Sequence, residues 1–96
     1  MTDTTLPSVA GLRSLVIGAL EEAGRVAPVS EIKSRVERLG AFTPDQLGRP
    51  HGSGPGSELH YRIRWALVDL RRSGTIVRRA PRVWALAADA NPRQEA

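Results

Sequence analysis

Residues 60–87 constrain the fold most, because they combine a basic helical pattern, a glycine and a short hairpin pattern. Residues 60–82 hold seven arginines against the single acidic residue Asp69, which gives this segment a net charge of +6. The whole chain carries only +4, so the remainder is net negative. Positive charge concentrated in this way indicates a surface that binds a polyanion.

The helix predicted over residues 58–73 has two distinct faces. Ser57 is of the type that caps helix N-termini, and Gly74 suits a helix stop. At about 100° per residue, one arc is aliphatic and is expected to face the core: Leu59, Ile63, Ala66, Leu67 and Leu70. The opposite arc holds aromatic and cationic residues, among them Tyr61, Arg64, Trp65 and Arg72. His60 and Arg71 lie on one flank, and Arg62 on the other.

A hairpin is predicted to follow, with strands over residues 75–79 and 82–87 and a turn at Ala80-Pro81. Ile76, with Val83 or Trp84, is expected to face the core, and Trp84 to pack the hairpin onto it. Three arginines then gather at the hairpin tip: Arg78, Arg79 and Arg82.

Two helices are predicted upstream. Ser8 is expected to cap the first, which runs to about Ala23 before Gly24. Its inward positions at helical spacing are Val9, Leu12, Val16 and Leu20. Residues 25–28 fit a short strand that pairs with the hairpin. Ser30 is expected to cap the second helix, residues 31–39, which Gly40 ends. The inward positions of that helix are Ile32, Val36 and Leu39.

Residues 41–56 join the second helix to the third. Residues 43–47 predict a single helical turn, with a threonine cap and proline at its first position. Residues 48–56 hold four glycines and two prolines but lack the Lys-Ser/Thr of a phosphate-binding P-loop. Two interpretations remain open: a flexible connector, or backbone amides of residues 53–57 that bind a phosphate together with the Ser57 hydroxyl.

The predicted element order gives a mainly α fold with a small β-wing. This is a winged helix-turn-helix: three helices and a hairpin of two or three strands. We expect a flexible N-terminus over residues 1–7, the folded domain over residues 8–87 and a polar tail over residues 88–96.

Composition argues against several functional classes. The chain has no cysteine, no basic N-terminal signal region and no apolar run near the roughly 18 residues of a membrane span. The ten acidic residues are scattered, and His51 and His60 flank a glycine-rich loop. We therefore expect a cytoplasmic protein that is not an enzyme, with no cofactor, no metal and no membrane partner.

The run from Arg62 to Ile76, with Val83-Trp-Ala-Leu86, resembles the N-terminal winged-helix domain of Mrr-like restriction proteins. The resemblance covers about residues 8–87, and its most specific positions are Trp65-Ala66, Leu70, Gly74, Ile76 and Trp84. It implies DNA binding, usually as the targeting half of a larger bacterial-type restriction enzyme. Related winged helices in modification-dependent nucleases read methylated bases. The nuclease domain that normally follows is absent from this sequence.

The expected partner is double-stranded DNA. The N-terminal half of the third helix would enter the major groove, Arg71 and Arg72 would meet phosphates, and the wing would lie over the adjacent backbone or minor groove. Trp65 is expected either to cover the second helix or to line a pocket for a modified base, and Tyr61 to be the more solvent-facing aromatic. The candidate DNA contacts are Ser53, Ser57, His60, Tyr61, Arg62, Arg64, Trp65, Arg71, Arg72, Arg78, Arg79 and Arg82.

Two other functions stay open at this point. Winged helices also act as protein-interaction or dimerisation modules, so a homodimer or a nuclease subunit is an alternative partner. A stand-alone transcription repressor is the third interpretation.

Overall fold

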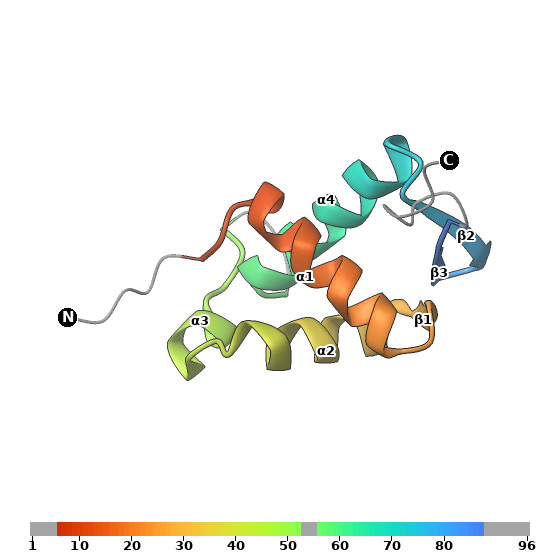
Figure 1. Ribbon diagram of the computed structural model, residues 1–96. Coiled ribbons are helices and arrows are strands. Elements are labelled where there is room, and N and C mark those ends of the chain that lie inside the picture. Colours follow the sequence, from red (N-terminus) through yellow and green to blue (C-terminus); the bar gives the residue numbers. More distant parts are fainter. Residues whose placement is uncertain (1–5, 53–55, 88–96) are drawn as a thin grey trace.

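The computed structural model describes residues 6–52 and 56–87 (Figure 1). The elements in chain order are α1 (Val9–Glu22), β1 (Val26–Pro28), α2 (Val29–Gly40), α3 (Pro44–Gly48), α4 (Glu58–Arg72), β2 (Ile76–Ala80) and β3 (Val83–Leu86). Helix α1 packs against both α2 and α4, and the small sheet lies at one end of the helices. This arrangement confirms the predicted fold class, a mainly helical winged helix with a three-stranded antiparallel sheet.

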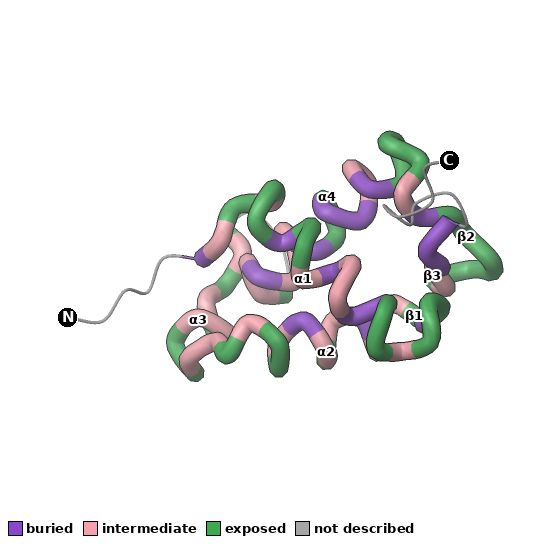
Figure 2. Tube along the Cα trace, viewed as in Figure 1, coloured by how far each residue is buried: buried purple, intermediate pink, exposed green. Residues whose placement is uncertain are grey.

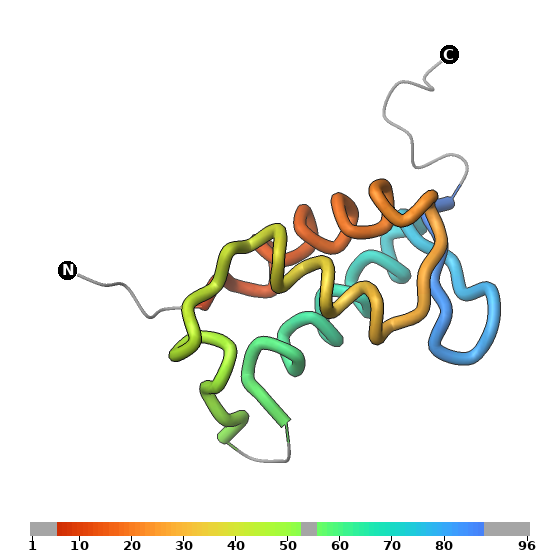
Figure 3. Tube along the Cα trace, turned by 90° about the horizontal axis from the view of Figure 1, so that it is seen from below, coloured from red at the N-terminus to blue at the C-terminus, as the bar shows by residue number. Residues whose placement is uncertain are grey.

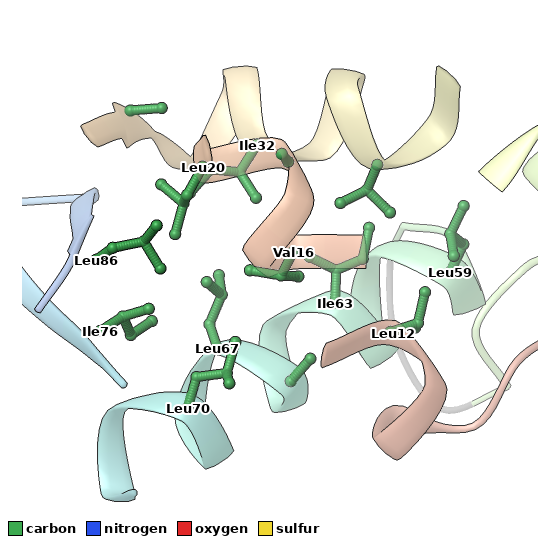
Figure 4. Close-up of a cluster of buried hydrophobic side chains, with 14 of the residues drawn as sticks. Leu12, Val16, Leu20, Ile32, Leu59, Ile63, Leu67, Leu70, Ile76 and Leu86 are labelled. Carbon is green, nitrogen blue, oxygen red and sulfur yellow. The ribbon is translucent and has the colours of Figure 1, made fainter. Parts of the chain in front are cut away.

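The core forms where the inner faces of the three long helices meet (Figure 2). Leu12, Val16 and Leu20 of α1 are fully buried, as the helical spacing predicted. All five aliphatic residues predicted for the inner face of α4 are buried as well. Ile76 and Leu86 close the core at the sheet end (Figure 4). Each such side chain contributes roughly 1.5–3 kcal/mol when buried, so the core fixes which face of α4 points outward.

The sheet has the order β1-β3-β2, and the predicted first strand is confirmed. Val26 of β1 and Val77 of β2 both pair with Ala85 of the central strand. The hairpin turn differs from the prediction, because it is centred on Pro81 and Arg82. The fixed φ of proline suits the first central position of a turn, and Arg82 follows at φ 62°. The pairing shifts register between Arg78 and Ala80, which leaves Arg79 at the irregularity.

Helix α2 corrects three sequence-based predictions. It begins at Val29, not Glu31, and its N-cap is Pro28, so Ser30 is not the cap. The Val29 N–H, which has no partner within the helix, donates to the Arg82 carbonyl of the hairpin turn (2.8 Å). Leu39, predicted to face the core, is 38% exposed, because it lies opposite Gly18 of α1, which has no side chain to cover it.

Gly40 is the last residue of α2, so the helix ends one residue later than predicted. A Cβ at this position would overlap the Phe42 ring, so glycine lets residue 42 pack beside the helix. The left-handed residue that ends α2 is Ala41, at φ 50°.

The other predicted helix ends are confirmed. The Ser8 hydroxyl accepts from the Gly11 N–H (3.2 Å), and the Ser57 hydroxyl accepts from the His60 N–H (3.1 Å). Thr43 and Gln46 form a capping box around α3. Gly74 takes the positive φ that follows α4, so the chain turns directly into β2.

Candidate nucleic-acid interface

Two adjoining hollows lie on the side of α4 that faces α2 and the hairpin. The first, of about 610 Å³, is lined by Val29, Lys33, Arg64, Leu67, Val68, Arg71, Arg72, Arg78, Arg82 and Trp84. The second, of about 930 Å³, is lined by residues 28–30, Lys33, Ser34, Glu37, Gly56, Ser57, His60, Tyr61, Arg64 and Arg82. Because Val29, Lys33, Arg64 and Arg82 line both, the hollows form one continuous depression, which we call the basic groove.

The basic groove is strongly cationic. Its lining holds six cationic side chains from three parts of the fold, namely Lys33, Arg64, Arg71, Arg72, Arg78 and Arg82. Among the described residues of the lining, the one carboxylate belongs to Glu37, and its Oε2 lies 2.6 Å from Nε2 of His60. That contact links α2 to the first turn of α4, and it places His60 beside a carboxylate at the groove wall.

The groove cations have no carboxylate partner within the described residues 6–52 and 56–87. Arg71 instead lies over the Trp84 ring, with 5.9 Å between its guanidinium carbon and the ring centroid. Such a cation–π contact orients Arg71 without neutralising its charge. Trp84 itself is packed against the core, as predicted, so it anchors the hairpin side of the groove.

Arg62 is placed differently from the other candidate residues on α4. Its Nε donates to Glu58 (2.7 Å), and Nη1 donates to the carbonyls of Leu6 and Pro7 (3.2 and 3.0 Å). It therefore ties α4 to the chain segment before α1, and it is not in the lining of the groove.

The aromatic residues of α4 reverse the expected order of exposure. Tyr61 is partly buried, because its ring stacks on His51 at a centroid distance of 3.8 Å and lines the groove. Trp65 is 42% exposed and contacts Tyr61 edge-on, at 6.5 Å. It is outside the lining of both hollows, so the more solvent-facing aromatic is Trp65.

The candidate residues of the loop and the wing divide into two groups. Arg78 and Arg82 line the groove with Ser57, whose hydroxyl also caps α4. Arg79 is exposed, lies outside the lining and falls at the register shift in β2. Ser53 lies outside the described residues.

Lys33 is a groove residue that the sequence reasoning did not select. It lies four residues after Val29 and four before Glu37, so the three form one stripe along α2. A helical wheel drawn for residues 29–40 would have shown this stripe beside the buried Ile32 and Val36. The lysine was overlooked because the second helix was read for its core positions alone.

Ion pairs perturb two groups away from the groove. The hydrogen bond from His51, followed by that from Arg62, lowers the pKa of Glu58 below its usual value. The hydrogen bond to Glu31, followed by that to Glu22, raises the pKa of Arg35. In both cases the hydrogen bonds stabilise the charged form, so the charges of Glu58 and Arg35 are satisfied within the fold.

The sequence profile of the Mrr N-terminal domain matches residues 12–91. The chain belongs to the Mrr N-terminal domain family. The match confirms the resemblance seen in the sequence and includes every cation of the basic groove. No curated protein and no solved structure matched the chain.

The Mrr N-terminal domain is the one domain identified in this chain, and no catalytic domain was identified beside it. Among residues 6–52 and 56–87, no cluster of three or more histidine or acidic side chains is arranged to hold a metal ion. Within the same described part of the chain, no helix has the length and apolar character needed to cross a membrane.

Proposed function

We propose that this Mrr N-terminal domain binds duplex DNA with the basic groove and the outward face of α4. The observation that carries the proposal is the set of six groove cations without carboxylate partners in the described chain. Cations held this close repel one another, and a polyanion relieves that repulsion. Duplex DNA presents one negative charge per roughly 1.7 Å of its axis, which suits a groove of this kind.

The orientation of α4 supports a division of contacts along the helix. Its inner face is buried, so Tyr61, Arg64 and Arg72 point away from the core. Tyr61 and Arg64 lie in the N-terminal half, the part of a recognition helix that enters the major groove. Arg64 also lines the basic groove, which is the side expected to meet the DNA backbone. Arg71 and Arg72 lie in the last turn and would contact phosphates. Cations there also stabilise the helix dipole, so their contribution to DNA affinity has to be measured separately.

In this proposal the domain is the targeting module of a cytoplasmic restriction-type system. The exposed ring of Trp65, beside Tyr61, adds an apolar surface to the edge of the helix. A methyl group on a modified base would gain contact with such a surface, as a thymine methyl does in the major groove. The domain would then prefer modified duplex.

The main test is a titration of random-sequence duplex DNA at several salt concentrations, with binding followed by fluorescence anisotropy. Arg64→Glu should weaken binding strongly. The matched control Arg13→Glu, an exposed position on α1 with the same charge change, should weaken it little. The proposal fails if the wild-type domain binds no duplex at low salt, or if both variants lose the same affinity.

A competition between methylated and unmethylated duplex tests the finer part of the proposal. Trp65→Ala should remove any preference for the methylated duplex and leave the salt dependence of binding unchanged. Exposure of Trp65 also favours the second candidate function, a protein-interaction surface. If Trp65→Ala instead changed the sedimentation coefficient and left DNA binding intact, the interaction function would be supported for this edge of α4.

A further inference from the structure

Three cations from three different elements converge where the two hollows of the basic groove meet. Lys33 comes from α2, Arg64 from α4 and Arg82 from the hairpin turn, and each lines both hollows. None of the three pairs with a carboxylate in the described parts of the chain, residues 6–52 and 56–87. Arg71, Arg72 and Arg78, by contrast, line only the first hollow.

The backbone of the hairpin turn is fixed against α2. The Val29 N–H donates to the Arg82 carbonyl (2.8 Å), and Pro28 pairs with Val83 in the sheet. Lys33 follows Val29 by one helical turn. In Figure 3 the hairpin extends beside the point where β1 leads into α2. Lys33 and Arg82 are therefore held on a common framework before any ligand arrives, which lowers the entropy cost of binding.

Arg82 has a backbone conformation that favours glycine. Its φ is 62°, in the left-handed region that L side chains rarely adopt. Pro81 and Arg82 are the two central residues of the turn. In turns of this kind the residue after proline has a positive φ and is usually glycine or asparagine. Arg25 and Ala41 also have positive φ, but of these residues only Arg82 lines the basic groove, and this combination motivates a binding hypothesis for its side chain.

We propose that Lys33, Arg64 and Arg82 together bind one phosphodiester group of the DNA backbone. An arginine fork and a lysine ammonium can donate to the two non-bridging oxygens at once, and one anion then relieves the repulsion among three cations. This inference rests on the proposed function and sharpens it. Arg82 binds the backbone beside α4, whereas the sequence placed it with the wing tip over the adjacent backbone or minor groove.

The test is a double-mutant cycle on duplex affinity and its salt dependence. Lys33→Gln and Arg82→Gly should each weaken binding by roughly tenfold. Because both side chains share one phosphate, the double variant should lose less than the product of the two single losses. The slope of log affinity against log salt should fall by no more than about one for the double variant, because a single phosphate is involved and Arg64 still contacts it.

Arg82→Gly is informative because glycine suits the turn. Its thermal unfolding midpoint should stay the same or rise, so a loss of affinity cannot come from unfolding. The matched wing control is Arg79→Gln, outside the groove, which should leave the coupling between Lys33 and Arg82 unchanged. If the two affinity losses were additive and the salt slope fell by about two, Lys33 and Arg82 would contact separate phosphates, which would overturn the inference. Unchanged duplex binding in both single variants would overturn it as well. Failure of the wild-type domain to bind duplex would instead overturn the proposed function, and the inference with it.

Discussion

Three arginines outside the basic groove differ from those inside it in what surrounds them. Arg35 and Arg38 of α2 both reach Glu22 of α1, and Arg62 of α4 reaches Glu58. We call these three the paired arginines. The groove cations have no such partners among the described residues. The comparison shows that arginines counted together in a sequence can serve two roles. Some form structural contacts within the fold, and others keep their charge available for a ligand.

Charge reversal in the groove should have the largest effect. The variant Arg64→Glu/Arg72→Glu should bind duplex DNA at least about 100-fold more weakly at low salt, since it removes two contacts and adds repulsion. Its unfolding free energy should change little, because neither side chain has a carboxylate partner in the described chain. Anisotropy titrations and chemical denaturation measure the two quantities. If this variant lost as much unfolding free energy as binding free energy, the groove cations would not differ from the paired arginines in role.

Truncation of a paired arginine should show the opposite pattern. Arg62→Ala loses the bonds to the Leu6 and Pro7 carbonyls as well as the contact with Glu58. We expect the unfolding free energy to fall by about 1–3 kcal/mol and duplex affinity to stay within about twofold. Urea denaturation monitored by tryptophan fluorescence checks the first value. A large loss of affinity in a folded Arg62→Ala protein would return Arg62 to the DNA interface.

Relief of backbone strain at residue 82 should give a smaller effect, and it should raise the unfolding free energy instead of lowering it. Arg82→Gly is expected to raise the unfolding free energy by up to about 1 kcal/mol, less the entropy that glycine costs in the unfolded chain. Arg82→Ala is the matched comparison, because it also removes the side chain but keeps the strained φ. If glycine were no more stable than alanine here, residue 82 would not be strained.

The smallest effect should be a pH dependence of stability from Glu58. Its pKa is lowered in the folded state, mainly by the hydrogen bond from His51 and then by that from Arg62. The stabilisation is therefore complete above the unfolded-state pKa of a glutamate, and it is lost as pH falls through the lower, folded-state pKa. Thermal melts between neutral and acidic pH should show a shallower acid decline for Glu58→Gln than for the wild type. Parallel pH profiles would mean that Glu58 does not contribute.

Much of the fold was predictable because its signals are local. The aliphatic stripe of α4, the Ser57 cap and the Gly74 stop occupy adjacent turns of one sequence segment, and all three are confirmed. Leu39 was misassigned because helical spacing gives a face but not which residue of the neighbouring helix lies opposite, and opposite Leu39 that residue is Gly18. The hairpin turn was placed one residue early because Pro81 was taken as its second central residue.

The candidate site was harder to predict, because it depends on contacts between distant segments. Arg62 and Arg64 both fall outside the aliphatic stripe, and both were predicted to contact DNA. Glu58, four residues before Arg62, was a usable signal for an ion pair. The contacts of Arg62 with residues 6 and 7 span more than 50 positions and need the fold. Lys33 enters the groove only through the position of α2 beside the hairpin.

The most direct test compares two triple variants that lose the same net charge. One replaces the groove residues Arg71, Arg72 and Arg78 with glutamine, and the other replaces the paired arginines Arg35, Arg38 and Arg62 with glutamine. Both would be checked for folding by circular dichroism and titrated with duplex DNA across a salt series. The groove variant should lower the slope of log affinity against log salt by about three, and the paired variant should leave it nearly unchanged. Equal slopes for the two variants would contradict the claim that the unpaired groove cations bind the DNA backbone.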